Sequence, residues 1–335
     1  MRDNDGLMNH ISLYNIFHDN FPSIHYYLSM KNKQTLTGFG YLILAASSYA
    51  TFGVLSRLIS GTFPAIAQNY IREAISISVI ILLVVTKILP WVKVQKKDVK
   101  WLIGFAFSNS LVMILLYLAF NSIAIGTVYF LFYSTMTITG LILGGIMFKE
   151  KMTTEKYIAF VLVCVGLVVM FSSSFEFDEL KYMIYSLLVG VMLGFHNNLA
   201  KKVSNIYHPL QIFFYASVAS FIVSVVVAVV IKESIPTIHF DPSLFWMIVY
   251  GLVVLLADIF MIYGYRRVEA QIASMIMPSE AFIAALFGWI LYKDALSTNV
   301  IVGGVLIMLA AIVPNLSSKV FKRQGDSSPL IKPQI

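Results

Sequence analysis

The feature that most constrains the fold is a series of apolar runs of about 20 residues, separated by short polar links. Wound as a helix, such a run just crosses the roughly 30 Å hydrocarbon layer of a membrane. Only 12% of the residues are charged, about half the share found in soluble domains. We therefore expect an all-α integral membrane protein with about ten transmembrane helices, at residues 39–58, 64–89, 101–123, 126–148, 153–171, 180–200, 209–231, 243–265, 270–292 and 297–314.

The positive charges fall at the ends of these runs rather than on one amphipathic face, so the net charge of +7 points to membrane orientation and not to nucleic acid. With the amino terminus inside, four Lys or Arg residues lie outside: Arg57, Lys181, Lys232 and Lys293. The cytoplasmic side collects seventeen, namely Lys31, Lys33, Lys87, Lys93, Lys96, Lys97, Lys100, Lys149, Lys151, Lys156, Lys201, Lys202, Arg266, Arg267, Lys319, Lys322 and Arg323. This bias predicts a protein of the bacterial inner (plasma) membrane with both termini in the cytoplasm.

The two ends of the chain and its cysteine carry no predicted chemistry. Residues 1–36 lack the continuous apolar stretch of a signal peptide, and we expect them to form a poorly ordered cytoplasmic tail, with a second tail at 317–335. The single cysteine, Cys164, has no partner for a disulfide or a thiolate metal site.

An internal repeat divides the chain. The segment Phe148 to Thr154 (FKEKMTT) matches Tyr292 to Thr298 (YKDALST) without a gap, at an offset of 144 residues. This match predicts two five-helix repeats, at 37–174 and 179–316. Because each repeat has an odd number of spans, the second enters the membrane upside down, and two inverted halves can expose a site between them to each side in turn.

Several short motifs resemble one transporter family. They are Arg72 in the second helix, Ala119 in the segment YLAFN (117–121), and the sequence KEKMT (149–153) after the fourth helix, with counterparts in the second half. This chain resembles the EamA-type family of the drug/metabolite transporter superfamily over residues 38–316. It departs from the family where Tyr49 and Ala50 replace a Trp-Gly pair, and where Ser134 corresponds to Pro278. Relatives of this fold carry amino acids, nucleotide sugars and other metabolites, so the resemblance implies a transporter without naming its substrate.

Four charged residues lie within apolar runs, where a charge costs roughly 2.5 to 3.5 kcal/mol on insertion scales. Arg72 and Glu73 could each pair with groups on neighbouring helices, or Arg72 could bind a substrate carboxylate or phosphate. Neighbouring helical residues point about 100° apart, so we do not expect both to face one cavity squarely. For Asp258 we favour a structural ion pair with Arg266 or Arg267, two turns later.

The strongest functional candidate is Glu280. It lies roughly 16 Å along its helix from Ala270, close to the bilayer midplane. Pro278, two residues earlier, removes one backbone hydrogen bond and can free a carbonyl. We predict that Glu280 meets a solute or a proton, with a buried ion pair to Arg72 as the alternative.

Uncharged polar residues could complete a solute site. His196 stands beside Asn197 and Asn198, and a lone histidine beside two amides is more often a hydrogen-bonded packing group than a proton relay. Aromatic and amide side chains that could line the site are Tyr49, Asn109, Tyr117, Asn121, Tyr129, Tyr133 and Tyr263. Each could instead form interhelical hydrogen bonds.

These patterns favour a secondary transporter of a small organic solute: an amino acid, a nucleotide-related compound or a drug-like molecule. The alternatives are an integral membrane enzyme, for which we find no carboxylate or histidine cluster, and a non-transporting receptor, which would not need an inverted repeat. We therefore predict no enzyme activity, metal or cofactor. Without a phosphate-binding glycine-rich loop, the energy source is an ion gradient, with protons as one candidate, solute exchange, or the substrate gradient itself.

Overall fold

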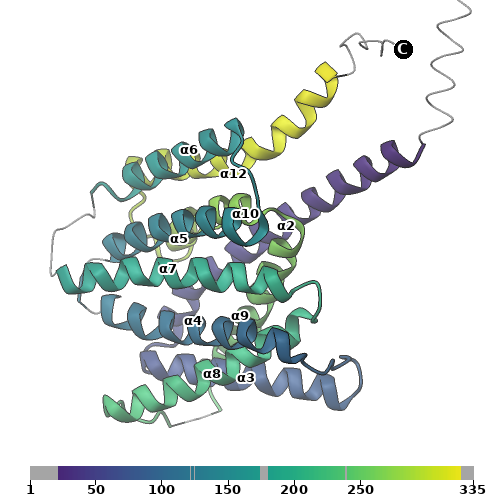
Figure 1. Cartoon of the computed structure of the whole chain (residues 1–335). Coiled ribbons are helices and arrows are strands. Elements are labelled where there is room, and N and C mark those ends of the chain that lie inside the picture. The colour runs from purple at the N-terminus through teal and green to yellow at the C-terminus, as the bar shows by residue number, and fades with distance from the viewer. Residues whose placement is uncertain (1–21, 121, 124, 174–179, 238–239, 326–335) are drawn as a thin grey trace, which may run out of the picture.

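The computed structural model describes residues 22–120, 122–123, 125–173, 180–237 and 240–325, and these are almost entirely helical. The helices lie side by side, with α6 and α12 at one edge of the bundle and α3 and α8 at the opposite edge (Figure 1). They are α2 (Pro22–Ile59), α3 (Ala65–Val85), α4 (Lys96–Phe120), α5 (Ile125–Phe148), α6 (Thr154–Phe171), α7 (Leu180–Val203), α8 (Pro209–Val230), α9 (Pro242–Arg267), α10 (Ala270–Ile276), α11 (Ser279–Tyr292) and α12 (Thr298–Gly325).

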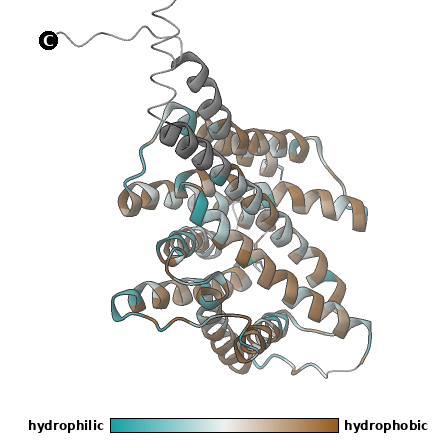
Figure 2. Cartoon of the chain, turned by 90° about the vertical axis from the view of Figure 1, so that its right-hand side faces the viewer, coloured by the Kyte–Doolittle hydropathy of each residue, from teal (hydrophilic) through white to brown (hydrophobic). Residues whose placement is uncertain are grey.

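Hydrophobic residues predominate along these helices, as the ribbon coloured by hydropathy shows (Figure 2). Ile146 and Val229, for example, are more than 70% exposed, as lipid-facing residues would be. Within the described residues, nine helices are long and apolar enough to cross a membrane, and the shorter apolar stretch Thr298–Pro314 supplies a tenth candidate. The expected fold, about ten membrane-spanning helices in two inverted repeats, is confirmed.

The helices differ from the expected ones in three places. Helix α2 begins at Pro22, so residues 22–36 are helical and do not belong to a disordered tail; proline suits the first turn, where its missing N–H would have no partner. The expected 270–292 helix breaks at Met277 and Pro278 into α10 and α11. Helix α12 continues past Pro314 to Gly325, because a proline disturbs the preceding turn without forbidding helix beyond it. Residues 1–21 lie outside the described part of the chain.

The offset of 144 residues relates the two halves throughout. It places Ile59 on Val203, Phe148 on Tyr292 and Thr154 on Thr298, and four of the five helix pairs begin or end at equivalent residues. In the fifth pair, α9 begins at Pro242, two residues after the position equivalent to the start of α4. Lys149 and Lys293, which follow the paired helices α5 and α11, both take left-handed backbone conformations, with φ of 56° and 59°. The repeat seen in seven residues therefore extends to the backbone of all five helix pairs.

The packing follows the same symmetry. Helix α2 packs against α9, just as its counterpart α7 packs against α4, and α5 packs against α7 as α11 packs against α2. The edge pairs α3 with α8 and α6 with α12 each join a helix to its own counterpart. At the α6–α12 edge, a Cβ added to Gly166 would lie 2.8 Å from the Gly303 carbonyl oxygen, so the backbones touch and only glycine fits.

The bundle has two distinct ends, which we name by the residues of the repeated motif. At the Glu150 end, Glu150 meets Lys201 and the start of α10, and Tyr207 meets Asp98. At the Asp294 end, Asp294 meets Arg57, and Glu233 accepts hydrogen bonds from the first amides of α3. Helix α5 ends at the Glu150 end and α11 at the Asp294 end, which is the inversion expected from the odd number of spans.

Candidate functional site

A cavity of about 380 Å³ lies between the two halves, in the size range of sites for small organic molecules. Its wall draws on helices from both repeats: α2, α3, α4 and α5 from the first, and α7, α8, α9 and α11 from the second. Nine of the twelve candidate residues line it: Tyr49, Arg72, Glu73, Asn109, Tyr129, Tyr133, His196, Asp258 and Glu280. Another, Tyr117, belongs to α4, but its side chain lies outside the described part of the structure.

Arg72 is held by aromatic groups. Its guanidinium donates a hydrogen bond to the Tyr250 hydroxyl at 3.1 Å, and it lies 5.5 Å from the ring centres of both Phe52 and Tyr250. Rings at this distance attract a cation through their quadrupole, which offsets part of the cost of burying it. The side chain remains at the cavity wall with its planar group oriented, as binding of an anionic solute group would need.

Glu73 also lines the cavity, contrary to our expectation for two neighbouring helical residues. Its carboxylate lies 3.9 Å from the Arg72 guanidinium, with Ser217 and Ser220 of α8 beside it. The long Arg72 side chain bends toward a wide cavity, so the 100° between the two Cβ directions does not separate the charged groups. Arg72 and Glu73 therefore act on the cavity as a pair of opposite charges.

The structure contradicts the ion pair expected for Asp258. Arg266 donates to the Asn205 side chain at 3.0 Å, and Arg267 donates to the Tyr263 carbonyl at 3.1 Å. Asp258 is buried on the cavity wall, where the Tyr49 hydroxyl lies beside its carboxylate. Arg266 is exposed and Arg267 is half-buried, whereas Asp258 is buried beside the cavity.

Glu280 occupies the first turn of α11, directly after the helix break at Pro278. Its carboxylate faces the Tyr133 hydroxyl across the cavity rather than Arg72, and Tyr129 of α5 lies near it. Among the described residues Arg72 forms its ion pair with Glu73, so the alternative of a buried Arg72–Glu280 pair is not what the structure shows. Three carboxyl groups and one guanidinium thus border one cavity, together with several tyrosines.

The neighbourhood of His196 fits a packing role better than a proton relay. Its Nδ1 lies 3.2 Å from the Phe105 carbonyl oxygen, and its ring stacks on that of Phe105 with centres 3.9 Å apart. The adjacent Asn198 donates to the Gly194 carbonyl within α7. Of the two remaining candidates, Tyr263 does not line the cavity, and Asn121 lies outside the described residues.

Sequence reasoning missed part of the wall. Asn69, whose amide contacts Ser220 and Ser224 of α8, could have been found, because residues 69, 72, 73 and 76 share one helical face. Phe52 and Tyr250 carry no such signal, since aromatic residues are common throughout these helices. In the part of the chain that the structure describes, no group of three or more His, Cys, Asp or Glu residues could hold a metal ion.

Comparison with known proteins identifies the family. The profile of the EamA-like transporter family matches the sequence twice, over residues 36–172 and 180–316, one match for each repeat. The chain belongs to the EamA-like transporter family. A crystal structure of a protein that is 14% identical superposes with a TM-score of 0.67, covering 87% of this chain and 99% of the other, which supports the fold alone. No curated protein sequence matches the chain.

Proposed function

We propose that this EamA-like protein is a secondary transporter that carries a small organic solute by alternating access, with the central cavity as the solute site. The observation that carries this proposal is the convergence of Arg72, Glu73, Asp258 and Glu280 on one cavity between two inverted repeats. Buried charges within a membrane domain are costly, and they are characteristic of solute and ion pathways. Amino acids, nucleotide-related compounds and drug-like molecules are the solute classes to test.

Glu280 is our candidate for the coupling or binding group. It stands at a helix break, faces the Tyr133 hydroxyl and borders the cavity, so a proton or a solute cation could reach its carboxylate. Protons are the coupling ion that this arrangement favours, because a carboxyl group can exchange a proton for a positively charged solute group.

The test is uptake and efflux by purified protein in proteoliposomes, screened across amino acids, nucleosides and cationic drugs with and without a proton gradient. Glu280→Gln keeps the side-chain shape and removes the charge, so it should insert normally and lose transport or its pH dependence. Glu155→Gln, on α6 and outside the cavity, is the matched control and should transport normally. A Glu280→Gln protein with the wild-type rate and pH profile would eliminate this role.

We further propose that the Glu150 end faces the cytoplasm of a bacterial inner membrane, with both termini on that side. The proposal rests on the seventeen Lys and Arg residues assigned to that side against four on the other. Reporter fusions after Lys97 and Lys322 should score cytoplasmic, and a fusion after Asp178 external. A cytoplasmic signal at Asp178 would contradict the ten-span topology.

A further inference from the structure

The two ends of the bundle carry the same cluster of side chains, related by the repeat. At one end Lys201 binds Glu150 at 3.0 Å, and at the other Arg57 binds Asp294 at 3.1 Å. The two cations are 144 positions apart in the sequence, and so are the two carboxylates. We call Phe148, Glu150 and Lys201 the Glu150 cluster, and Tyr292, Asp294 and Arg57 the Asp294 cluster.

The aromatic residues of the two clusters correspond as well. The Lys201 ammonium lies 5.0 Å from the centre of the Phe148 ring, and the Arg57 guanidinium lies 4.1 Å from the centre of the Tyr292 ring. None of the three pairs is identical, since Lys201 corresponds to Arg57, Glu150 to Asp294 and Phe148 to Tyr292. The preserved chemistry is that of a cation between a carboxylate and a ring, which suggests that both clusters perform the same task.

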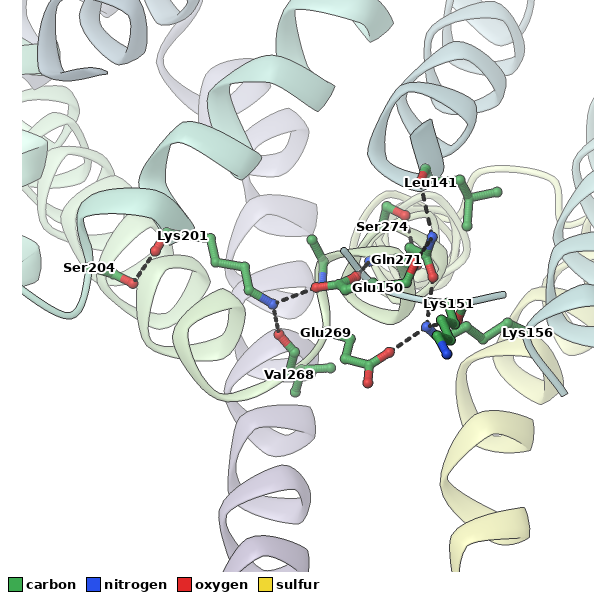
Figure 3. Close-up of polar contacts among 11 residues, drawn as sticks. Leu141, Glu150, Lys151, Lys156, Lys201, Ser204, Val268, Glu269, Gln271 and Ser274 are labelled. Atoms are coloured by element: carbon green, nitrogen blue, oxygen red, sulfur yellow. Dashed lines mark hydrogen bonds and ion pairs between the residues drawn. The ribbon is translucent and has the colours of Figure 1, made fainter. Parts of the chain in front are cut away.

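The clusters differ in what the carboxylate touches. Glu150 accepts hydrogen bonds from the first two amides of α10, those of Ala270 at 2.7 Å and Gln271 at 2.9 Å (Figure 3). Its side chain and that of Lys201 are only 7% and 15% exposed. Glu150, which follows α5, thereby fastens the end of α5 to the start of α10, and the Gln271 side chain adds a bond to the Leu141 carbonyl of α5 at 3.1 Å.

The Asp294 cluster is not docked in this way. Asp294 and Arg57 are about half exposed, and a second cavity of about 200 Å³ lies between Asp294 and Tyr129 on α5. By the repeat, the amides that correspond to Ala270 and Gln271 are those of Gly126 and Thr127, at the start of α5. Asp294 stands apart from the helix end that its counterpart binds.

The positions of the two cavities match this difference between the clusters. The second cavity extends from Glu280 and Tyr129 to Arg57 and Asp294, so the solute site continues toward the Asp294 end. Within the described structure, neither cavity is lined by any residue of 141–156 or 200–211, the segments that hold the Glu150 cluster. These two cavities therefore extend toward the end where the carboxylate is not docked and do not reach the segments at the end where it is docked.

We propose that Glu150 and Asp294 are the positioning residues that close the two ends in turn. In the structure described, Glu150 docked on α10 closes its end; in the opposite state Glu150 leaves α10, and Asp294 docks on the amides of Gly126 and Thr127 at the start of α5. The same two inverted halves would then have exchanged conformations. This inference rests on the proposed alternating-access function and adds the groups that make and break contact at each end.

The test measures thiol accessibility, so it requires no identified substrate. Cys164 is the sole cysteine, and a Cys164→Ala background permits single reporters. Thr137→Cys reports opening of the Glu150 end, because Thr137 is buried and its hydroxyl donates to the Ser274 carbonyl between α5 and α10. Ala284→Cys, in the wall of the second cavity, reports opening of the Asp294 end. Labelling rates are measured with a charged thiol reagent on protein in lipid nanodiscs.

With Glu150 intact, the reporter at 284 should react readily and the reporter at 137 slowly. Glu150→Gln removes the charge that strengthens its bonds, so labelling at 137 should rise by roughly 10-fold or more while labelling at 284 falls. Adding Asp294→Asn should restore labelling at 284, because neither carboxylate can then dock fully. Glu155→Gln, outside both clusters, should change neither rate.

Unchanged rates at both positions in a folded Glu150→Gln protein would overturn the proposal, as would a fall at 284 that Asp294→Asn does not reverse. If Glu150→Gln does not fold, Asp294→Asn with Glu150 retained replaces it, because Asp294 is about half exposed. This change disfavours the state in which Asp294 is docked, so labelling at 137 should fall below the wild-type rate, and labelling at 137 that stays unchanged or rises would overturn the proposal. A protein that transports nothing but shows these accessibility changes would contradict the assigned function and not the exchange of contacts.

Discussion

The two ends of the bundle are built from corresponding residues, yet they differ in burial and in the polar contacts that hold the helices together. The Glu150 cluster is buried and reinforced, since Lys156 also binds the Gln271 side chain and Glu269 there. The positions that correspond to Lys156, Glu269 and Gln271 in the other half are Val300, Ile125 and Thr127, none of which can ionise. The repeat therefore supplies two similar clusters, and a few unmatched substitutions decide which end is held closed in this structure.

The largest expected difference concerns the paired cations. Lys201→Met leaves the buried Glu150 carboxylate without its cation and should destabilise the protein by about 3 kcal/mol. The corresponding Arg57→Met removes a half-exposed ion pair and should cost at most about 1 kcal/mol. Thermal unfolding in detergent, compared at equal protein concentration, measures both. Equal losses of stability for the two variants would show that the two ion pairs contribute equally, which would contradict this prediction.

Gly144 and Gly288 occupy corresponding positions near the two clusters, and replacing each by alanine compares how tightly the two ends are packed. A Cβ at Gly144 would lie 2.6 Å from the Gln271 Cγ and 3.2 Å from its backbone nitrogen, so Gly144→Ala should separate α5 from α10 at a cost of about 1 to 3 kcal/mol. At Gly288 the close neighbour is an oxygen at the end of the Asp294 side chain, which can move aside. Gly288→Ala should unfold within about 1 kcal/mol of wild type, and a larger loss there than at Gly144 would contradict this reasoning.

A smaller effect is expected from the second ion pair of the Glu150 end. Glu269 is about half exposed, whereas Lys156 is buried and also donates to the Gln271 side chain and to the Lys151 carbonyl. Glu269→Gln should therefore cost less than about 1 kcal/mol. A double-mutant cycle with Lys156→Met measures the coupling, and a coupling as large as the Lys201→Met loss would make this pair, and not Glu150, the main contact of that end.

The smallest effect concerns pH. His208, at the Glu150 end, precedes α8 and accepts a hydrogen bond from the Leu210 amide. Burial, and then the charge of Arg266, lower its pKa below the ordinary value. Because a histidine with a lowered folded-state pKa favours folding when neutral, its contribution is present above about pH 6.5 and lost as the pH falls below that value.

The corresponding residue at the other end is Pro64, which cannot titrate. His208→Gln keeps a hydrogen-bonding side chain without a titratable ring, and should reduce the small loss of thermal stability between about pH 6.5 and 5. An identical pH profile for wild type and variant would show that His208 does not contribute to the pH dependence of stability.

Hydropathy and internal similarity were enough to predict the membrane fold, the number of helices and the inverted repeat. Hydropathy over about 20 residues is a local property of the chain, and a lipid environment forces such runs into helices whatever their neighbours are. It also marked Arg72, Glu73, Asp258 and Glu280, because a charge within an apolar run stands out without any structure. The residues 150 and 294 were visible as a repeated motif, but their task was not.

Which of these groups come into contact depends on how the helices pack. The convergence of α3, α9 and α11 on one cavity, and the role of Tyr250 and Phe52 beside Arg72, depend on contacts between residues far apart in the chain. The surroundings of Asp258 also depend on such contacts, because Arg266 and Arg267, two turns later, bind other partners. The repeat predicts that Glu150 and Asp294 are equivalent, whereas packing docks one on a helix end and leaves the other about half exposed. The difference between the two ends arises from contacts between helices in the assembled bundle, and these contacts are not visible in the repeated sequence.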